Sequence, residues 1–401
     1  ISYLLRSLGN PHEQLSVVHV GGTNGKGSVL AMLDSILRSA GYRVGRYTSP
    51  HLISLNERFL VNAECISDEE LDEQIGEVRK IAERMNPLPT FFECATAVGF
   101  NWMAKKKVDV ALVEVGMGGR FDATNVVSPI VSAITTIGLE HTKYLGDTLE
   151  KIAFEKAGII KNGKPVVINE RNPGPLNVML GRAAELNSPV YLVDRDYRFE
   201  IQHDSMFHSF RYYGKKINVG PVRLGLAGAY QGDNAAACVA IVEQLLGHFP
   251  AVTLEAVRNG LSSARWPCRL EKVKENPPVI IDVAHNAHGA LRLAEELERC
   301  VLVLAVSSDK AADQIIACLG QKTDELILTQ FSGERSLPVD ELCKAAGNHA
   351  YKRFADLREA LRAGLELASD HKPLVITGSI FLAGEARKIL IEEYGADPLK
   401  F

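Results

Sequence analysis

The chain has 401 residues, with 45 Lys and Arg against 49 Asp and Glu, and a formal net charge of −4. This mixed charge gives no basic surface of the kind that attracts nucleic acid or an anionic membrane, so we expect small-molecule partners, no nucleic acid and no membrane. The length exceeds what one hydrophobic core usually supports and predicts two domains. No apolar run approaches the roughly 20 residues of a membrane span.

The cysteines indicate a reducing compartment. There are seven, they are scattered, and no two have the C-x-x-C spacing, which argues against both a disulfide framework and a zinc site. We therefore expect a cytoplasmic protein. The first residues lack the basic-then-apolar layout of a signal peptide. Because the chain opens on Ile1 rather than Met, the sequence leaves open whether further residues, including a removed targeting segment, precede it.

The stretch from Val17 to Leu37 predicts a phosphate-binding loop between a buried strand and a helix over 28–37. Glycines let a polyphosphate approach the backbone N–H groups, the helix points its positive end at the anion, and Lys26 adds a full charge. Gly27 separates Lys26 from Ser28, so the common P-loop pattern is matched only loosely. An ordinary tight turn is the alternative.

Downstream, strands alternate with helices, which predicts a mostly parallel sheet covered on both faces. We expect strands at 42–47, 109–115, 130–136, 166–168 and 190–193, and helices at 68–84, 91–106, 148–158 and 176–186. The stretch 196–224 predicts an antiparallel appendage, followed by helices at 231–246 and 253–261.

A second, smaller α/β unit follows a boundary that we place around 265–278, where prolines interrupt the pattern. Its expected strands are 279–282, 301–306, 325–329 and 375–377, and its expected helices are 287–299, 310–319, 339–346, 356–368 and 381–391.

Three polar clusters fall at the carboxyl ends of predicted strands, where open α/β sheets collect their ligands. The first is the turn 48–51, which Pro50 alone could explain. The second begins at Glu114, a carboxylate suited to Mg²⁺ shared with phosphate oxygens, unless it pairs with Arg120. The third joins His141 to Lys156; by residue type alone these predict a structural histidine and a solvated lysine.

Six motifs in one order resemble the folylpolyglutamate synthase and dihydrofolate synthase family of the Mur ligase superfamily. They are GTNGKGS at 22–28, SPH at 49–51, EVGMGGRFDATN at 114–125, EHT at 140–142 with EKAGIIK at 155–161, DVAHN at 282–286 and TGS at 377–379. The resemblance implies a P-loop ATPase domain with a mostly parallel sheet over 1–268. It also implies a Rossmann-like α/β ligase domain over 269–401, with the active site between the two.

The resemblance also assigns roles to single positions. It implies that Lys26, Glu114, His141 and Lys156 are catalytic. ATP would be held by Thr23, Asn24, Gly25, Lys26, Gly27, Ser28, Asn234, Arg269 and Asp282, with His285 a weaker candidate. One Mg²⁺ would lie at Ser49 and Glu114 and a second near His141 and Lys156, the lysine carrying a CO₂-derived carbamyl group. The folate would lie against Thr90, Phe91, Phe92, Glu93, Phe121, Asp122 and Ala123.

The activity that the resemblance implies is an ATP-dependent addition of L-glutamate to tetrahydrofolate, and to dihydropteroate as well, through an acyl phosphate, by a monomer. A peptidoglycan Mur ligase and a non-catalytic nucleotide-binding module are the alternatives.

The chain departs from the family pattern in two places. Cys268 stands where the family usually has glycine, which we expect to shift Arg269 slightly, and the turn 306–310 is only partly matched, so we assign it no role.

Overall fold

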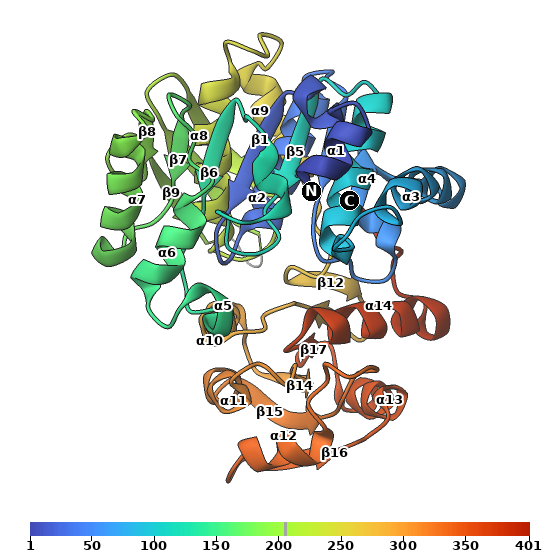
Figure 1. Ribbon diagram of the computed structural model, residues 1–401. Helices are drawn as coiled ribbons and strands as arrows, with labels where there is room; N and C mark the ends of the chain where they lie inside the picture. The colour runs from blue at the N-terminus through green and yellow to red at the C-terminus, as the bar shows by residue number, and fades with distance from the viewer. Residues whose placement is uncertain (204–206) are drawn as a thin grey trace.

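An eight-stranded sheet organises the first part of the chain (Figure 1). The computed structural model describes residues 1–203 and 207–401. The strands run in the order β4-β3-β2-β5-β1-β6-β7-β8, with the pairs β2–β3 and β3–β4 antiparallel and the others parallel. Their bounds are β1 Val17–Gly21, β2 Val44–Tyr47, β3 Phe59–Val61, β4 Glu64–Cys65, β5 Val110–Glu114, β6 Val131–Ile134, β7 Val166–Ile168 and β8 Val190–Leu192. The mostly parallel sheet is confirmed, and the short β3–β4 pair is an addition to it.

Helices cover both faces of this sheet. Their bounds are α1 Ser2–Ser7, α2 Lys26–Ser39, α3 Asp68–Ala82, α4 Phe91–Lys105, α5 Thr142–Leu145, α6 Leu149–Ala157, α7 Pro173–Glu185, α8 Gln231–Leu245 and α9 Leu254–Ser263. The 3₁₀ turns are η1 Pro11–Gln14, η2 Leu55–Arg58 and η3 Ala123–Val126. α2 starts two residues earlier than predicted because Gly25, with a φ of 90°, forms its left-handed N-cap. Lys26 and Gly27 therefore belong to the first turn of the helix.

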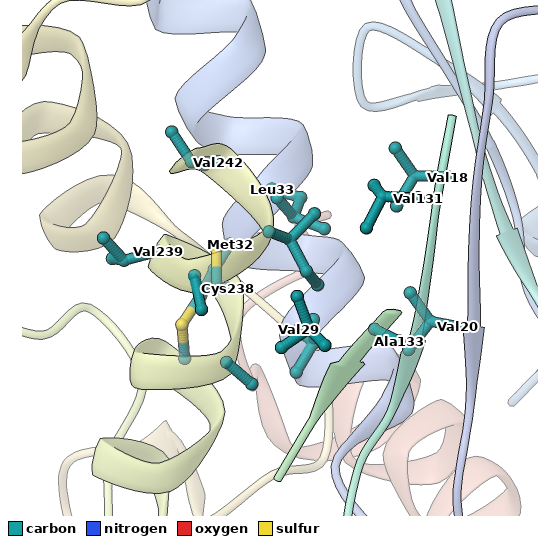
Figure 2. Close-up of a cluster of buried hydrophobic side chains, with 14 of the residues drawn as sticks. Val18, Val20, Val29, Met32, Leu33, Val131, Ala133, Cys238, Val239 and Val242 are labelled. Atoms are coloured by element: carbon teal, nitrogen blue, oxygen red, sulfur yellow. The ribbon is translucent and has the colours of Figure 1, made fainter. Parts of the chain in front are cut away.

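The main hydrophobic core lies between α2, α8 and the sheet. Val18 and Val20 of β1 point toward Leu33 of α2, and Cys238 and Val239 of α8 close the same cluster (Figure 2). Neighbouring β1 residues point to opposite faces, so Val17 joins a second core with α1, α3 and α4. Burial on both faces explains why the strands are runs of valine and leucine rather than alternating patterns.

A six-stranded sheet follows residue 268 and forms the lower part of the molecule in Figure 1. Its order is β12-β13-β17-β14-β15-β16, and only the β12–β13 pair is antiparallel. The strands are β12 Glu271–Lys274, β13 Val279–Ile281, β14 Cys300–Leu304, β15 Thr323–Leu328, β16 Tyr351–Arg353 and β17 Leu374–Thr377. The helices are α10 Ala287–Glu296, α11 Ala312–Gly320, α12 Val339–Ala345, α13 Leu357–Leu367 and α14 Ile380–Tyr394. This second α/β unit is also confirmed.

The predicted antiparallel appendage is a three-stranded sheet in the order β11-β10-β9. Its strands are β9 Arg198–Gln202, β10 Ser209–Tyr213 and β11 Asn218–Arg223. Positions 204–206, which the expected stretch 196–224 includes, lie outside the described residues. In the ranges 1–203 and 207–401, no helix has both the length and the apolar character that a bilayer crossing needs.

Truncating the core between α2 and the sheet should destabilise the protein. Leu33 is fully buried, so Leu33→Ala should lower the free energy of unfolding by about 2–5 kcal/mol through lost burial and a cavity. Leu254→Ala, at a leucine that is 46% exposed, is the matched control and should change it by less than about 0.5 kcal/mol. Urea unfolding followed by circular dichroism measures both, and equal effects would contradict this account of the core.

Candidate active site

A cavity of about 910 Å³ lies between the two α/β units, at the carboxyl ends of strands from both. It is lined by most of the residues that the sequence singles out. They are Thr23, Asn24, Gly25, Lys26, Gly27, Ser28, Ser49, Thr90, Phe92, Glu93, Glu114, Phe121, Asp122, Ala123, His141, Asn234, Arg269, Asp282 and His285. Two predicted residues, Phe91 and Lys156, do not line it.

The phosphate loop is fixed by contacts to the neighbouring strand end. Thr23 donates its N–H to the Thr136 carbonyl at 2.8 Å, and Thr135 donates its hydroxyl to the Asn24 carbonyl at 2.7 Å. The Lys26 Nζ donates to two carbonyls of its own loop, those of Gly22 at 3.0 Å and Thr23 at 3.1 Å. The loop is thereby preorganised, with its lysine held at the start of α2.

Gly25 is required by both conformation and space. Its φ is 90°, and a Cβ there would meet the Asn234 Oδ1 at 2.2 Å. Asn234 comes from α8, far along the chain, and donates its Nδ2 to Gln231 at 2.8 Å. The amide of Asn234 is therefore packed directly against the phosphate loop, beside the site that the sequence assigns to the nucleotide.

Glu114 ends β5 inside the cavity and is 6% exposed. Its Oε2 accepts the Ser49 N–H at 3.1 Å, so the structure brings this predicted pair together. Arg120 instead pairs with Glu155 at 2.7 Å, so the alternative of a Glu114–Arg120 salt bridge is wrong. Burial raises the pKa of Glu114, and the Lys26 ammonium opposes that rise.

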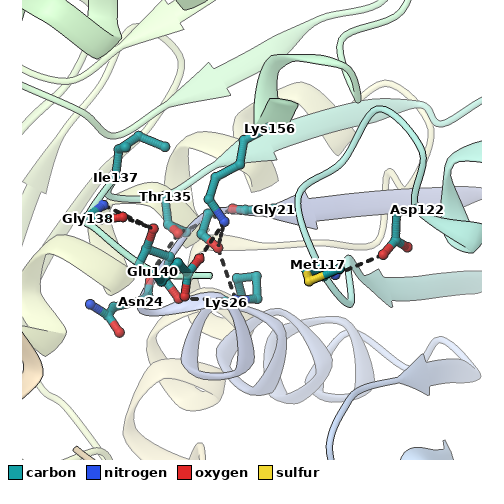
Figure 3. A network of polar contacts seen from close by, with 12 residues as sticks. Gly21, Asn24, Lys26, Met117, Asp122, Thr135, Ile137, Gly138, Glu140 and Lys156 are labelled. Atoms are coloured by element: carbon teal, nitrogen blue, oxygen red, sulfur yellow. Dashed lines mark hydrogen bonds and ion pairs between the residues drawn. The ribbon is translucent and has the colours of Figure 1, made fainter. Parts of the chain in front are cut away.

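Lys156 lies behind the cavity wall rather than in solvent, because α6 turns it toward the phosphate loop. It is 2% exposed, and its Nζ donates to the Gly22 carbonyl at 2.8 Å and to the Glu140 Oε1 at 2.7 Å (Figure 3). Burial lowers the pKa of Lys156 to about 8, although the negative charge of Glu140 acts in the opposite direction and raises it. Desolvation would raise the pKa of Glu140, but the charges of Lys156 and Lys26 lower it to about 2.

His141, next to Glu140, sits in the left-handed region with a φ of 48° and caps the start of α5. Its ring lines the cavity, and burial lowers its pKa. Lys310 and Asp309, from the turn that follows β14, line the same cavity from the second unit, and their charges also shift that pKa. The turn 306–310, to which the sequence assigned no role, thus contributes Ser307, Asp309 and Lys310 to the cavity.

The aromatic side of the cavity is built around a glycine turn. A Cβ at Gly116 would meet the Cζ atom of Phe92 at 2.3 Å, so the tip of this ring packs directly against the turn. Asp122 holds the turn by accepting the Met117 N–H at 2.9 Å (Figure 3). Phe121 is 82% exposed at the edge of the same cavity. An aromatic, half-open surface of this kind suits a flat heterocycle.

The start of α4 differs from the expectation in one position. Thr90 and Glu93 form a capping box, in which Glu93 accepts the Thr90 N–H at 2.8 Å, so both side chains also have a structural role. Phe91, the first residue of the helix, does not line the cavity. It is 61% exposed, with the Arg58 guanidinium over its ring at 5.4 Å.

Residues of the second unit close the cavity from the far side. Asp282 is buried, and its two oxygens accept the N–H groups of Leu270 at 2.9 Å and Ala284 at 2.7 Å. The Nδ2 of Asn24, in the phosphate loop, lies 3.1 Å from the Nδ1 of His288, which is a direct contact between the two units. Sequence reasoning gave no role to His288, which has no local pattern that separates it from an ordinary surface residue, and none to Glu140, although it opens the EHT motif at 140–142.

The donor set favours an ion shared with a ligand over a closed metal cluster. Over residues 1–203 and 207–401, no group of three or more His, Cys, Asp or Glu side chains converges as a metal site. Mg²⁺ usually takes one or two carboxylates, keeps waters and binds substrate phosphates, so it does not need such a group. A buried Glu114 beside a phosphate loop fits that pattern.

Two family models match the chain. The Mur ligase middle domain matches residues 20–242, and the Mur ligase glutamate ligase domain matches residues 268–380. The dihydrofolate synthase/folylpolyglutamate synthase of Bacillus subtilis is 35% identical over 400 residues, which cover 96% of this chain and 93% of that protein.

Solved structures agree with the family models. The folylpolyglutamate synthase of Mycobacterium tuberculosis complexed with ADP and AMPPCP superposes with a TM-score of 0.92 at 33% identity, over 99% of this chain and 95% of that one. The Escherichia coli FolC in complex with DHPP and ADP gives a TM-score of 0.89 at 28% identity, over 98% and 92%. The chain therefore belongs to the folylpolyglutamate synthase/dihydrofolate synthase family of Mur ligases.

Proposed function

We propose that the protein is an ATP-dependent amide ligase that adds L-glutamate to folates. The observation that carries the proposal is one cavity lined by the phosphate loop, by Glu114, by an aromatic pocket and by basic residues of the second unit. The names of the relatives support the substrate class, since the Bacillus subtilis protein is a dihydrofolate synthase/folylpolyglutamate synthase. The ADP and AMPPCP of the Mycobacterium tuberculosis complex support ATP as the co-substrate.

The reaction has two steps. An oxygen of the folate carboxylate attacks the γ-phosphorus of ATP and ADP leaves, which gives an acyl phosphate. The amine of glutamate then attacks the acyl carbon, loses a proton, and displaces inorganic phosphate as the amide forms. Lys26 neutralises charge that develops on the transferring phosphoryl group, and closure of the two units around the substrates would keep water from the acyl phosphate.

The nucleotide would be held from both units. The loop residues Thr23 to Ser28 supply N–H groups and the Lys26 charge, and Asn234 lies against Gly25. Arg269 and Asp282 line the opposite wall. This arrangement makes nucleotide binding depend on how close the two units stand, with the stretch 265–278 as the hinge between a domain of residues 1–268 and one of 269–401.

Ser49 and Glu114 would hold one Mg²⁺ ion, and His141 and Lys156 would lie near a second. When bound, Mg²⁺ would neutralise phosphate oxygens and orient the γ-phosphate. The fit at the first site rests on the burial of the Glu114 carboxylate, whose ionised form needs a cation nearby.

Lys156 would carry a carbamate formed with CO₂. Only a neutral amine adds CO₂, and burial lowers the pKa of Lys156 to about 8, which increases the neutral fraction at physiological pH. A carbamate would place a second anion against Glu140, so it fits only with a cation between them. The carbamate and the second metal are therefore expected together.

The folate ring would stack at Phe92 and Phe121, near Asp122 and Ala123, with Thr90 and Glu93 at the start of α4. The DHPP of the Escherichia coli complex supports a pterin substrate that enters this site. Because the whole segment is present, we propose that both dihydropteroate and tetrahydrofolate are accepted. A peptidoglycan substrate is not favoured, because the relatives that match the full chain carry folate names.

Glutamate would bind on the side of the second unit. Ser379 caps α14, and this helix N-terminus faces the cavity together with Lys310 and Arg335. A helix N-terminus and two cations suit the carboxylates of an amino acid. We propose that the active form is a monomer. Seven free cysteines are consistent with the cytoplasmic location that the sequence predicts.

The substrate proposal is tested by ADP release from ATP and glutamate. We expect glutamate-dependent ADP release with dihydropteroate and with tetrahydrofolate offered separately, and none with a UDP-linked muropeptide. Lys26→Ala is the inactive control, since it removes the charge next to the γ-phosphate. Turnover with the muropeptide alone would overturn the folate assignment, and unchanged turnover in Lys26→Ala would remove the loop from the mechanism.

Lys156→Ala tests the carbamate. The variant should lose ADP release by at least about 100-fold, because the anion that faces the cation is missing. Short carboxylates such as acetate or propionate should restore part of it by occupying the vacated space. Lys151→Ala, at an exposed lysine of the same helix, is the matched control and should stay active. Loss of activity without any rescue would count against the carbamate.

A further inference from the structure

In the segment that joins the two units, Arg269 lies between two residues that have an unusual backbone conformation. Cys268 has a φ of 56° and Leu270 a φ of 48°, so both lie in the left-handed region that side chains other than glycine rarely adopt. Arg269 stands between them and lines the cavity. Such a backbone persists only where the surrounding structure holds it in place.

Two carboxylates hold this segment by its N–H groups. The Asp282 Oδ2 accepts the Leu270 N–H at 2.9 Å, and the Glu271 Oε2 accepts the Cys268 N–H at 2.8 Å. Asp282 is itself part of the cavity wall, whereas Glu271 lies outside the cavity. Because Glu271 does not line the cavity, it can affect a ligand there only through the linking segment.

Glu271 is in turn paired with a buried arginine. Arg387 of α14 is fully buried, and its Nη2 donates to the Glu271 Oε1 at 3.0 Å and to the Pro398 carbonyl at 3.4 Å. Its Nε and Nη1 have no hydrogen-bond partner among the residues that the structure describes. A buried guanidinium is costly without a carboxylate, and nothing in the reaction uses this pair. Because Glu271 also contacts Cys268, the pair is placed to support the linking segment.

We propose that Glu271, backed by Arg387, is a positioning residue for nucleotide binding. Its carboxylate keeps Cys268 in its left-handed conformation and so aims Arg269 into the cavity. The inference rests on the proposed function, because it takes Arg269 to bind the nucleotide. Cysteine makes the support necessary: glycine would adopt a φ of 56° without strain, whereas Cys268 must be held there.

Glu271→Gln is the first test. Cys268 and Arg387 donate to different oxygens of Glu271, and in the amide one of these positions becomes an NH2 donor, so one of the two contacts loses its acceptor. The KM for ATP should rise about tenfold, the loss expected for one charge-assisted hydrogen bond, with a smaller change in kcat. Glu271→Asp keeps the charge beside Arg387 but shortens the reach, and should raise the KM in the same direction. Thermal unfolding shows that each variant is folded.

Glu185→Gln is the matched control, because this carboxylate of α7 is 66% exposed, pairs with Arg182 and lies outside both the cavity lining and the linking segment. It should leave the KM for ATP unchanged. A positioning role also predicts a rescue that a general structural role does not. In a Cys268→Gly background position 268 adopts its φ without the Glu271 contact, while Asp282 still holds Leu270, so adding Glu271→Gln should raise the KM for ATP by less than about threefold.

Equal effects of Glu271→Gln in the two backgrounds, or no effect in either, would overturn the inference. Arg269→Ala separates this failure from failure of the proposed function. If Arg269→Ala raises the KM for ATP and the Glu271 variants do not, the positioning role of Glu271 is wrong and the proposed function still holds. If Arg269→Ala leaves the KM unchanged in an active enzyme, the nucleotide role of Arg269 falls, and the inference falls with it.

Discussion

The arrangement of charges in the cavity depends on the ammonium group of Lys26, which is held among buried charged side chains. Lys26 is fixed by carbonyls of its own loop, and its charge shifts the pKa values of Glu114, Glu140 and Lys156. These three side chains come from different parts of the chain and are buried, so their charges interact far more strongly than they would in water. A polyphosphate at the loop therefore enters a site where the protein has already arranged its charges.

The fold provides this arrangement through the order of its strands. β1 lies between β5 and β6, so the phosphate loop, Glu114 and the residues after β6 reach the same edge of the sheet. The second unit then places Arg269, Lys310 and Ser379 on the opposite side. Phosphoryl transfer and amide formation need both sides, which explains why the proposed reaction depends on the linking segment between them.

Much of this could be predicted from sequence because local patterns carry it. Valine-rich strands and a glycine loop with a lysine place Lys26, and a carboxylate at a strand end identifies Glu114. Other features depend on tertiary contacts that no local pattern records. The sequence of α6 does not show that Lys156 is buried against Gly22, and the pair of phenylalanines at the start of α4 does not show that Phe92 lines the cavity whereas Phe91 does not. Cys268 was recognised as a departure, but its left-handed backbone emerges only from the structure.

The central claim is that the terminal phosphate passes to the carboxylate that accepts glutamate. It is tested most directly with a folate substrate whose reacting carboxylate carries ¹⁸O, followed by mass spectrometry of the released phosphate. If an acyl phosphate forms, one ¹⁸O atom per turnover leaves with the phosphate. Released phosphate that carries no label, with amide product formed at the same rate, would contradict the account.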